Sequence, residues 1–211
     1  EDGTLSGKTW SLEGTVHREN GPAETECHDN GQIEFETWKH HGITHRDDGP
    51  AELAYDENGQ LEEMTWYRDG EIHRDGEPAT LKYRGGILNE AGWFENGVCL
   101  RVVEYFSTGE TRSEYTYIDG VLGSKEGPSR IGFNKDGEKV EEEWFENGKP
   151  HREDGPAEIL SDPDGTVREK RWKKHGSWHR DGAPARILYD EDGNVFREDW
   201  YVDGRSASPP D

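Results

Sequence analysis

A seven-residue motif that returns at a constant spacing constrains this chain more than any other feature of its sequence. The motif, His-Arg-x-Asp-Gly-Pro-Ala, occurs in five clear copies and one degenerate copy, at residues 17–23, 45–51, 73–79, 151–157, 179–185 and, degenerate, 123–129. On either side of the centre the copies start 28 residues apart, and tryptophans and turn glycines keep nearly the same step. A fixed period of about 20–50 residues is typical of stacked repeats, so each copy is expected to build the same unit.

One copy, residues 45–72, reads as two strands joined by turns. Residues 51–55 alternate apolar and other side chains, which indicates a half-buried strand. An Asn-Gly dipeptide at 58–59 then predicts a hairpin turn, because glycine tolerates a positive φ angle. A second strand at 61–67 carries a tryptophan, and an Asp-Gly turn at 69–70 leads into the next motif.

The sequence therefore predicts an all-β fold, since no helical periodicity persists and glycine recurs too often. We expect an elongated array of about seven antiparallel β-hairpins, forming a single extended twisted sheet or a solenoid-like stack. One detail is open: Leu61 and Trp66 are five residues apart and would face opposite sides of a regular strand. Either a β-bulge shifts the phase, or both faces are covered, and we favour partial covering of the second face by the proline loop.

The repeats extend over one array, residues 1–206, followed by a flexible tail at 207–211. The expected units are 1–16 (partial), 17–44, 45–72, 73–99, 100–122 (shortened), 123–150, 151–178 and 179–206. The centre, at about 97–130, departs from the pattern. There the Asp-Gly-Pro-Ala loop is missing, and the degenerate copy has lost its His-Arg pair.

Composition excludes several classes of function. The net charge is −22, which disfavours direct binding to nucleic acid or to anionic membranes. Two cysteines cannot build a disulfide-rich scaffold, no apolar run could span a bilayer, and no signal peptide is recognised. Only 29% of residues are hydrophobic, which suits a thin repeat core better than a large globular one. The charge is uneven: residues 17–44 carry −4 and residues 45–72 carry −7.

The repeat W-x-x-x-G-x-x-H-R-x-D-G-P-A resembles a variant of the MORN (membrane occupation and recognition nexus) hairpin repeats. Such repeats are found in bacteriophages and large DNA viruses, and related ones in bacterial antitoxins. The resemblance covers residues 10–206 and implies an array of antiparallel hairpins used as a binding surface, with no common catalytic residues. The 28-residue period exceeds the shorter MORN unit, so the membrane roles of that family are not expected here.

We assign no catalytic residue, metal ligand or cofactor, and expect the protein not to be an enzyme. The His-Arg-x-Asp motif occurs too often for a catalytic site, so we expect Arg to pair with a carboxylate and His to pack on Trp or bond to the backbone. The Asp-rich turns at 162–165 and 190–193 are too short for calcium loops. The histidines beside glycine turns, His40, His41 and His175, are ordinary polar loop residues.

The acidic early repeats are the predicted binding surface. We expect the protein to dock on a basic partner, as an inhibitor or immunity (antitoxin-type) protein of phage or bacterial origin, in the cytoplasm (the host's, if viral). The alternatives are a DNA mimic that inhibits a nucleic-acid enzyme, and a structural array. Open edge strands could also pair end to end. The predicted contact residues are Glu24, Glu26, Glu52, Asp56, Glu57, Glu62, Glu63 and, as an aromatic anchor, Trp178.

Overall fold

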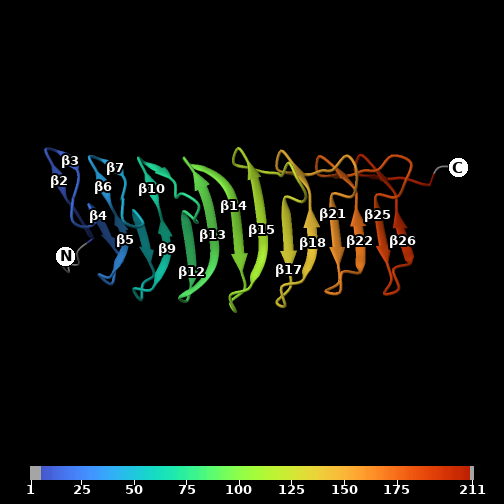
Figure 1. Cartoon of the computed structure of the whole chain (residues 1–211), viewed down its shortest axis with the longest axis horizontal. Coiled ribbons are helices and arrows are strands. Elements are labelled where there is room, and N and C mark those ends of the chain that lie inside the picture. The colour runs from blue at the N-terminus through green and yellow to red at the C-terminus, as the bar shows by residue number, and fades with distance from the viewer. Residues whose placement is uncertain (1–5, 210–211) are drawn as a thin grey trace. The chain divides into compact units, whose positions relative to one another are not determined.

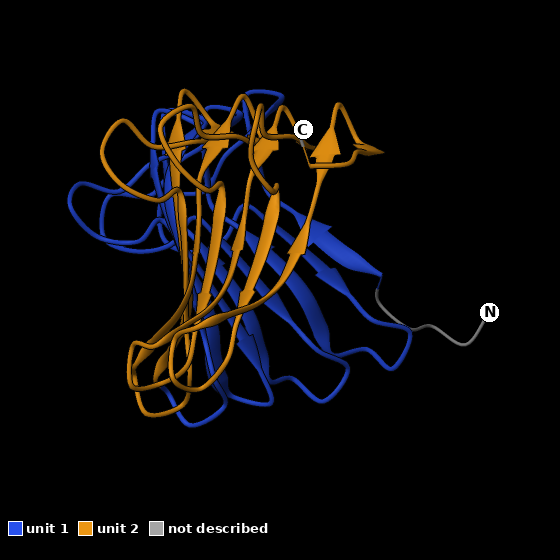
Figure 2. Ribbon diagram, turned by 90° about the vertical axis from the view of Figure 1, so that its right-hand side faces the viewer, with its two compact units in different colours: residues 1–109 blue, residues 110–211 orange. Residues whose placement is uncertain are grey.

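The structure, a computed structural model, describes residues 6–209 and is all-β. No residue in that range is helical, which confirms the predicted fold class. The chain divides into two compact units, residues 1–109 and 110–211, and their boundary falls inside the altered centre (Figure 2). Each unit is a row of antiparallel hairpins, and each is described by itself.

The first unit contains one sheet and several small two-stranded hairpins. Its sheet strands pair in the order β1 (Gly7–Thr9), β4 (Glu24–Cys27), β5 (Ile33–Thr37), β8 (Glu52–Tyr55), β9 (Leu61–Thr65), β12 (Thr80–Arg84), β13 (Ile87–Glu95) and β14 (Val98–Tyr105) (Figure 1). Its small hairpins are β2 (Ser11–Leu12) with β3 (Thr15–Val16), β6 (Lys39–His40) with β7 (Ile43–Thr44), and β10 (Tyr67–Arg68) with β11 (Glu71–Ile72).

The second unit repeats this plan. Its sheet strands pair in the order β15 (Thr111–Ile118), β17 (Arg130–Phe133), β18 (Lys139–Glu143), β21 (Glu158–Ser161), β22 (Val167–Arg171), β25 (Arg186–Tyr189) and β26 (Val195–Asp199), and β16 (Val121–Leu122) also pairs with β15 (Figure 1). Its small hairpins are β19 (Phe145–Glu146) with β20 (Lys149–Pro150), β23 (Lys173–Lys174) with β24 (Ser177–Trp178), and β27 (Tyr201–Val202) with β28 (Arg205–Ser206).

Loss of the proline loop has a visible effect on the strands of the altered centre. In a regular copy a sheet strand and a small-hairpin strand are separate, but β13 has 9 residues and β14 has 8. The chain passes directly from Arg101 into the main strand because no loop intervenes. The guanidinium of Arg101 nevertheless lies 4.7 Å from the Trp93 ring centroid, where a motif arginine would lie in a regular copy.

A β-bulge explains the five-residue spacing between Leu61 and Trp66. Tyr55 pairs with Leu61 and Ala54 pairs with Glu63, so Glu62 is the extra residue. This shift puts Leu61 and Trp66 on the same face, and a register shift at the corresponding position occurs in the other regular copies. The bulge, and not the favoured covering of the second face, accounts for the five-residue spacing.

The His-Arg motif holds neighbouring copies together. The five motif histidines each accept, through Nδ1, the backbone N–H of the first turn residue of the next small hairpin, at 3.1–3.3 Å. That residue has a positive φ angle, as in Asp69 (51°), and is followed by a glycine with positive φ, the pattern of a type I′ turn. The expectation that His bonds to the backbone is confirmed, and the link explains why the motif recurs with the period.

Arginine, rather than histidine, packs on the tryptophan. The five motif arginines lie with Cζ 3.8–4.3 Å from a tryptophan ring centroid, a stack that contributes about 0.5–2 kcal/mol each. The expected carboxylate pairs also form, as between Arg46 and Asp48 at 2.7 Å. Beneath the loops the motif alanines are 0% exposed, and Ser129 at the same position of the degenerate copy is 2% exposed. The core is a line of alanines, while the leucines, tyrosines and tryptophans of the repeats are mostly half-buried.

Candidate binding surface

Strand pairing in the first unit gathers four of the predicted contact residues on one face of the sheet. Glu24 and Glu52 both lie opposite Thr37, and Glu26 lies two residues from Glu24 on the same strand. Glu63 pairs with Ala54, which lies two residues beyond Glu52. Because side chains alternate across a strand, Glu24, Glu26, Glu52 and Glu63 share a face, which we call the acidic face.

The acidic face has few cationic side chains near it. Lys39 pairs with Glu24, and farther along the same face Lys82 pairs with Glu90 at 2.8 Å. Glu52 accepts a hydrogen bond from Tyr67; burial and this carboxylate raise the pKa of the Tyr67 phenol. The unit as a whole has 9 basic and 23 acidic residues, a net charge of −14. Its field therefore favours a cationic partner.

An exposed aromatic side chain lies within this face, and the sequence did not reveal it. Phe35 pairs with both Glu26 and Ala54 in neighbouring strands and is 43% exposed. Its position was hidden because the bulge at Glu34 reverses the alternation that would assign a face. Aromatic side chains are enriched at protein–protein interfaces, so an exposed phenylalanine on this face is a candidate contact.

The other predicted acidic residues lie apart from the acidic face. Asp56 accepts the backbone N–H groups of Asn58 and Gln60 at 2.9 and 2.8 Å, and these hydrogen bonds hold the pKa of its carboxyl below the usual range. Asp56 therefore builds its own hairpin turn. Glu57 lies exposed in the same turn, and Glu62 is exposed at the bulge.

Trp178 lies in the second unit and is half-buried. Its ring lies 5.7 Å from that of Tyr201, and the Lys173 ammonium lies 5.2 Å from its centroid. These contacts are packing within and between small hairpins, so the ring is less available as an anchor than Phe35.

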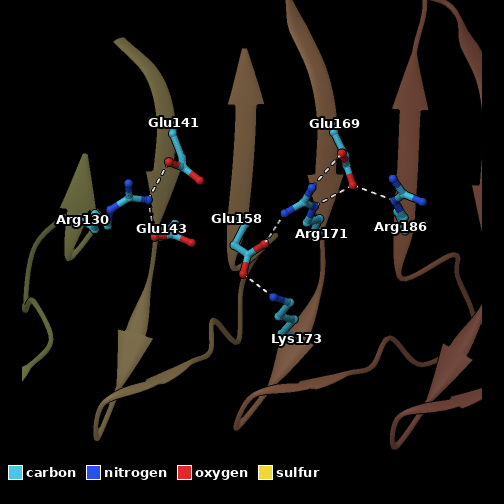
Figure 3. Close-up of polar contacts among 8 residues, drawn as sticks. All are labelled: Arg130, Glu141, Glu143, Glu158, Glu169, Arg171, Lys173 and Arg186. Carbon is cyan, nitrogen blue, oxygen red and sulfur yellow. Dashed lines mark hydrogen bonds and ion pairs between the residues drawn. The ribbon is translucent and has the colours of Figure 1, made fainter. Parts of the chain in front are cut away.

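The second unit has a different surface on the corresponding face, because its charges neutralise one another. Successive cross-strand partners run Arg130, Glu143, Glu158, Arg171 and Arg186. Figure 3 shows the resulting ladder of ion pairs, which also includes Glu141, Glu169 and Lys173.

The two buried carboxylates of this ladder, Glu158 and Glu169, each have two cationic partners, which offset the cost of their burial. Glu158 is 4% exposed and pairs with Arg171 at 3.0 Å and with Lys173. Burial alone would raise the pKa of Glu169, but hydrogen bonds from Arg171 and Arg186 outweigh it and lower that pKa. The second unit has 16 basic and 24 acidic residues, and its ladder carboxylates are already paired.

No family model matches this chain, and no curated protein matches it. Within residues 6–209 the structure has no helix with the length and apolar character that a membrane span requires.

Proposed function

We propose that the protein is a non-enzymatic, protein-binding repeat protein whose acidic face docks on a basic partner. The observation that carries the proposal is the contrast between the two units. Corresponding sheet faces hold paired charges in residues 110–211, but a surplus of carboxylates around exposed Phe35 in residues 1–109.

The physical chemistry favours this assignment. The sheet fixes the spacing of the backbone positions that carry the carboxylates, and complementary charge on a partner would speed encounter and select that partner. Phe35 would supply the apolar contact that charge alone lacks. The MORN-like motif suggests that the partner is the target of an inhibitor or immunity protein, in the cytoplasm of the bacterial or host cell.

The test compares two variants with equal charge change. The first, Glu24→Gln/Glu26→Gln/Glu52→Gln/Glu63→Gln, removes the acidic face. The control changes four exposed glutamates of the second unit that form no ion pair in the ladder, Glu126→Gln/Glu153→Gln/Glu191→Gln/Glu198→Gln. Each protein is immobilised, exposed to bacterial lysate at low and high salt, and the retained proteins are identified by mass spectrometry.

We expect a basic protein that the wild type and the control retain and that the acidic-face variant loses. Equal retention by all three proteins contradicts the proposal. Displacement of that protein by added duplex DNA would instead support the DNA-mimic alternative, in which the carboxylates occupy a nucleic-acid groove.

A further inference from the structure

Three histidines from two adjacent small hairpins converge in the first unit. His17 follows β3, while His40 ends β6 and His41 is the first residue of the turn after it. Each offers one ring nitrogen, and these nitrogens all lie within 4.8 Å of one another. We propose that His17, His40 and His41 bind a divalent transition-metal cation of the zinc type.

The fold does not require a histidine at either turn position. The residue corresponding to His41 in the other copies is Glu13, Asp69, Asn96, Asp119, Asn147, His175 or Asp203, all with positive φ. Position 40 corresponds to Leu12, Arg68, Glu95, Ile118, Glu146, Lys174 and Val202. The turn therefore forms without histidine at either position. A structural requirement does not explain why His40 and His41 both lie beside His17, and ligand binding does.

The ring orientations allow sharing of an ion. The His40 ring lies at 77° to that of His41 and at 62° to that of His17, with centroids 4.4 and 4.9 Å apart. The His41 ring is stacked on that of His17 at 21° and 4.7 Å, so His41 has to turn before both rings can point at one ion. A metal lies in the plane of each imidazole that binds it, so rings at large angles can meet at one ion. His40 and His41 are exposed and can rotate to bring the nitrogens to the roughly 3.4 Å separation of tetrahedral ligands about 2.1 Å from zinc.

Metal binding by His17, the third ligand, costs one hydrogen bond. Nδ1 of His17 accepts the His41 backbone N–H at 3.2 Å, so the neutral ring carries its proton on Nε2. Binding a metal through Nε2 moves this proton to Nδ1 and breaks that hydrogen bond. Nε2 of His17 is the atom available to a metal. In three other copies the motif histidine hydrogen-bonds through Nε2 to an aspartate two residues later, as in His45, His73 and His179. Glu19 stands at that position after His17, and Nε2 of His17 has no such partner among residues 6–209.

Two observations favour a soft-to-borderline divalent cation. Imidazole is the ligand that zinc, copper and nickel share, whereas calcium and magnesium require oxygen. The surrounding unit has a net charge of −14, and Lys39, next to His40 in the sequence, is paired with Glu24.

The group Glu146, His151 and His175 provides an internal comparison. Its ligand atoms also lie within 4.8 Å of one another, but it offers only two imidazoles, which are stacked at 4° and 4.3 Å. Its third member is a carboxylate: Glu146 lies 3.4 Å from Nε2 of His151 and 3.5 Å from Nδ1 of His175, at the sequence position that His40 has in the first unit. The proposal is therefore confined to the three-histidine cluster.

The test titrates tag-free full-length protein with zinc chloride by calorimetry at neutral pH. His41→Asn removes one imidazole and keeps a residue that sister turns already use, and His175→Asn is the matched control. We expect one zinc site in the wild type, weakened more than about tenfold in His41→Asn and unchanged in His175→Asn. Equal affinity in His41→Asn and wild type, or no site tighter than about 1 mM, overturns the proposal.

A second readout separates ligation from loss of folding. Long-range ¹H–¹⁵N spectra of the histidine rings report which nitrogen carries the proton. On adding zinc, the His17 ring should change from the Nε2–H to the Nδ1–H form, with the metal on Nε2. Zinc binding that leaves the His17 tautomer unchanged contradicts its role as a ligand. The thermal unfolding of His41→Asn in chelator should match that of the wild type.

Discussion

Replacing His73 tests whether the motif histidines link neighbouring repeats. The His73 side chain is 6% exposed, and its Nδ1 accepts the Asn96 backbone N–H at 3.2 Å. In His73→Ala this amide loses its acceptor, at a cost of about 1–3 kcal/mol, and the deleted ring leaves a cavity. We expect the free energy of unfolding to fall by about 2–4 kcal/mol in total.

The matched variant is His73→Asn, whose side-chain oxygen can occupy the place of Nδ1. It should recover about half of the loss, because an acceptor is restored without the full ring. His45→Ala should cost only about 1–2 kcal/mol, since that side chain is 23% exposed.

The assay combines urea denaturation, followed by circular dichroism, with hydrogen exchange of the Asn96 amide. Exchange should accelerate in His73→Ala and be slower again in His73→Asn. Equal destabilisation by the two substitutions, or an unchanged Asn96 exchange rate in His73→Ala, would refute the hydrogen bond as the link between copies.

Three further predictions concern individual carboxylates and one phenol. Asp56→Ala should destabilise its hairpin by about 1 kcal/mol in urea denaturation yet leave partner capture unchanged, because Asp56 caps a turn; lost capture would contradict this. Burial and the Glu36 carboxylate raise the pKa of Tyr55 to about 12, so its contribution to stability is present below about pH 10 and lost as the pH rises through 12. Tyr55→Phe should abolish that alkaline loss, and an identical alkaline stability profile would argue against it. Glu158→Gln should cost about 3 kcal/mol, since it removes the carboxylate partner of Lys173 and one of the two partners of Arg171, whereas exposed Glu153→Gln should cost less than about 0.5 kcal/mol; equal costs would contradict a stabilising role for the Glu158 ion pairs.

Much of the fold could be predicted because each copy repeats the same turn dipeptides and the same alternating strand pattern. The Asn58-Gly59 and Asp69-Gly70 turns lie where the dipeptides placed them, and strands flank them as expected. The bulge at Glu62 could not be assigned from the sequence, because the five-residue spacing of Leu61 and Trp66 fits either a bulge or a strand that is covered on both faces. Only the paired register in the structure distinguishes the two.

The candidate surface was also predictable only where the strands are regular. Glu24, Glu26 and Glu52 share a face, and regular alternation along a strand is enough to place them there, since no bulge precedes them in their strands. Phe35 escaped notice because it follows a bulge. The sequence shows the charge of Asp56, which suggests a contact residue, but not the two backbone amides that its carboxylate binds.

The histidine cluster was beyond prediction for a different reason. His17 and His41 are separated by 24 residues, and only the stacking of one small hairpin on the preceding one brings them together. The repeat period did imply neighbouring hairpins, but not that a turn residue sits over the motif histidine of the copy before it.

Carboxyl footprinting of the free protein and of its complex with the captured basic partner tests the acidic face most directly. Carbodiimide-driven labelling, read by mass spectrometry, reports the access of each carboxylate. Our account predicts that Glu24, Glu26, Glu52 and Glu63 lose labelling in the complex while Glu153 keeps it. Unchanged labelling of those four, with protection elsewhere, would contradict the account.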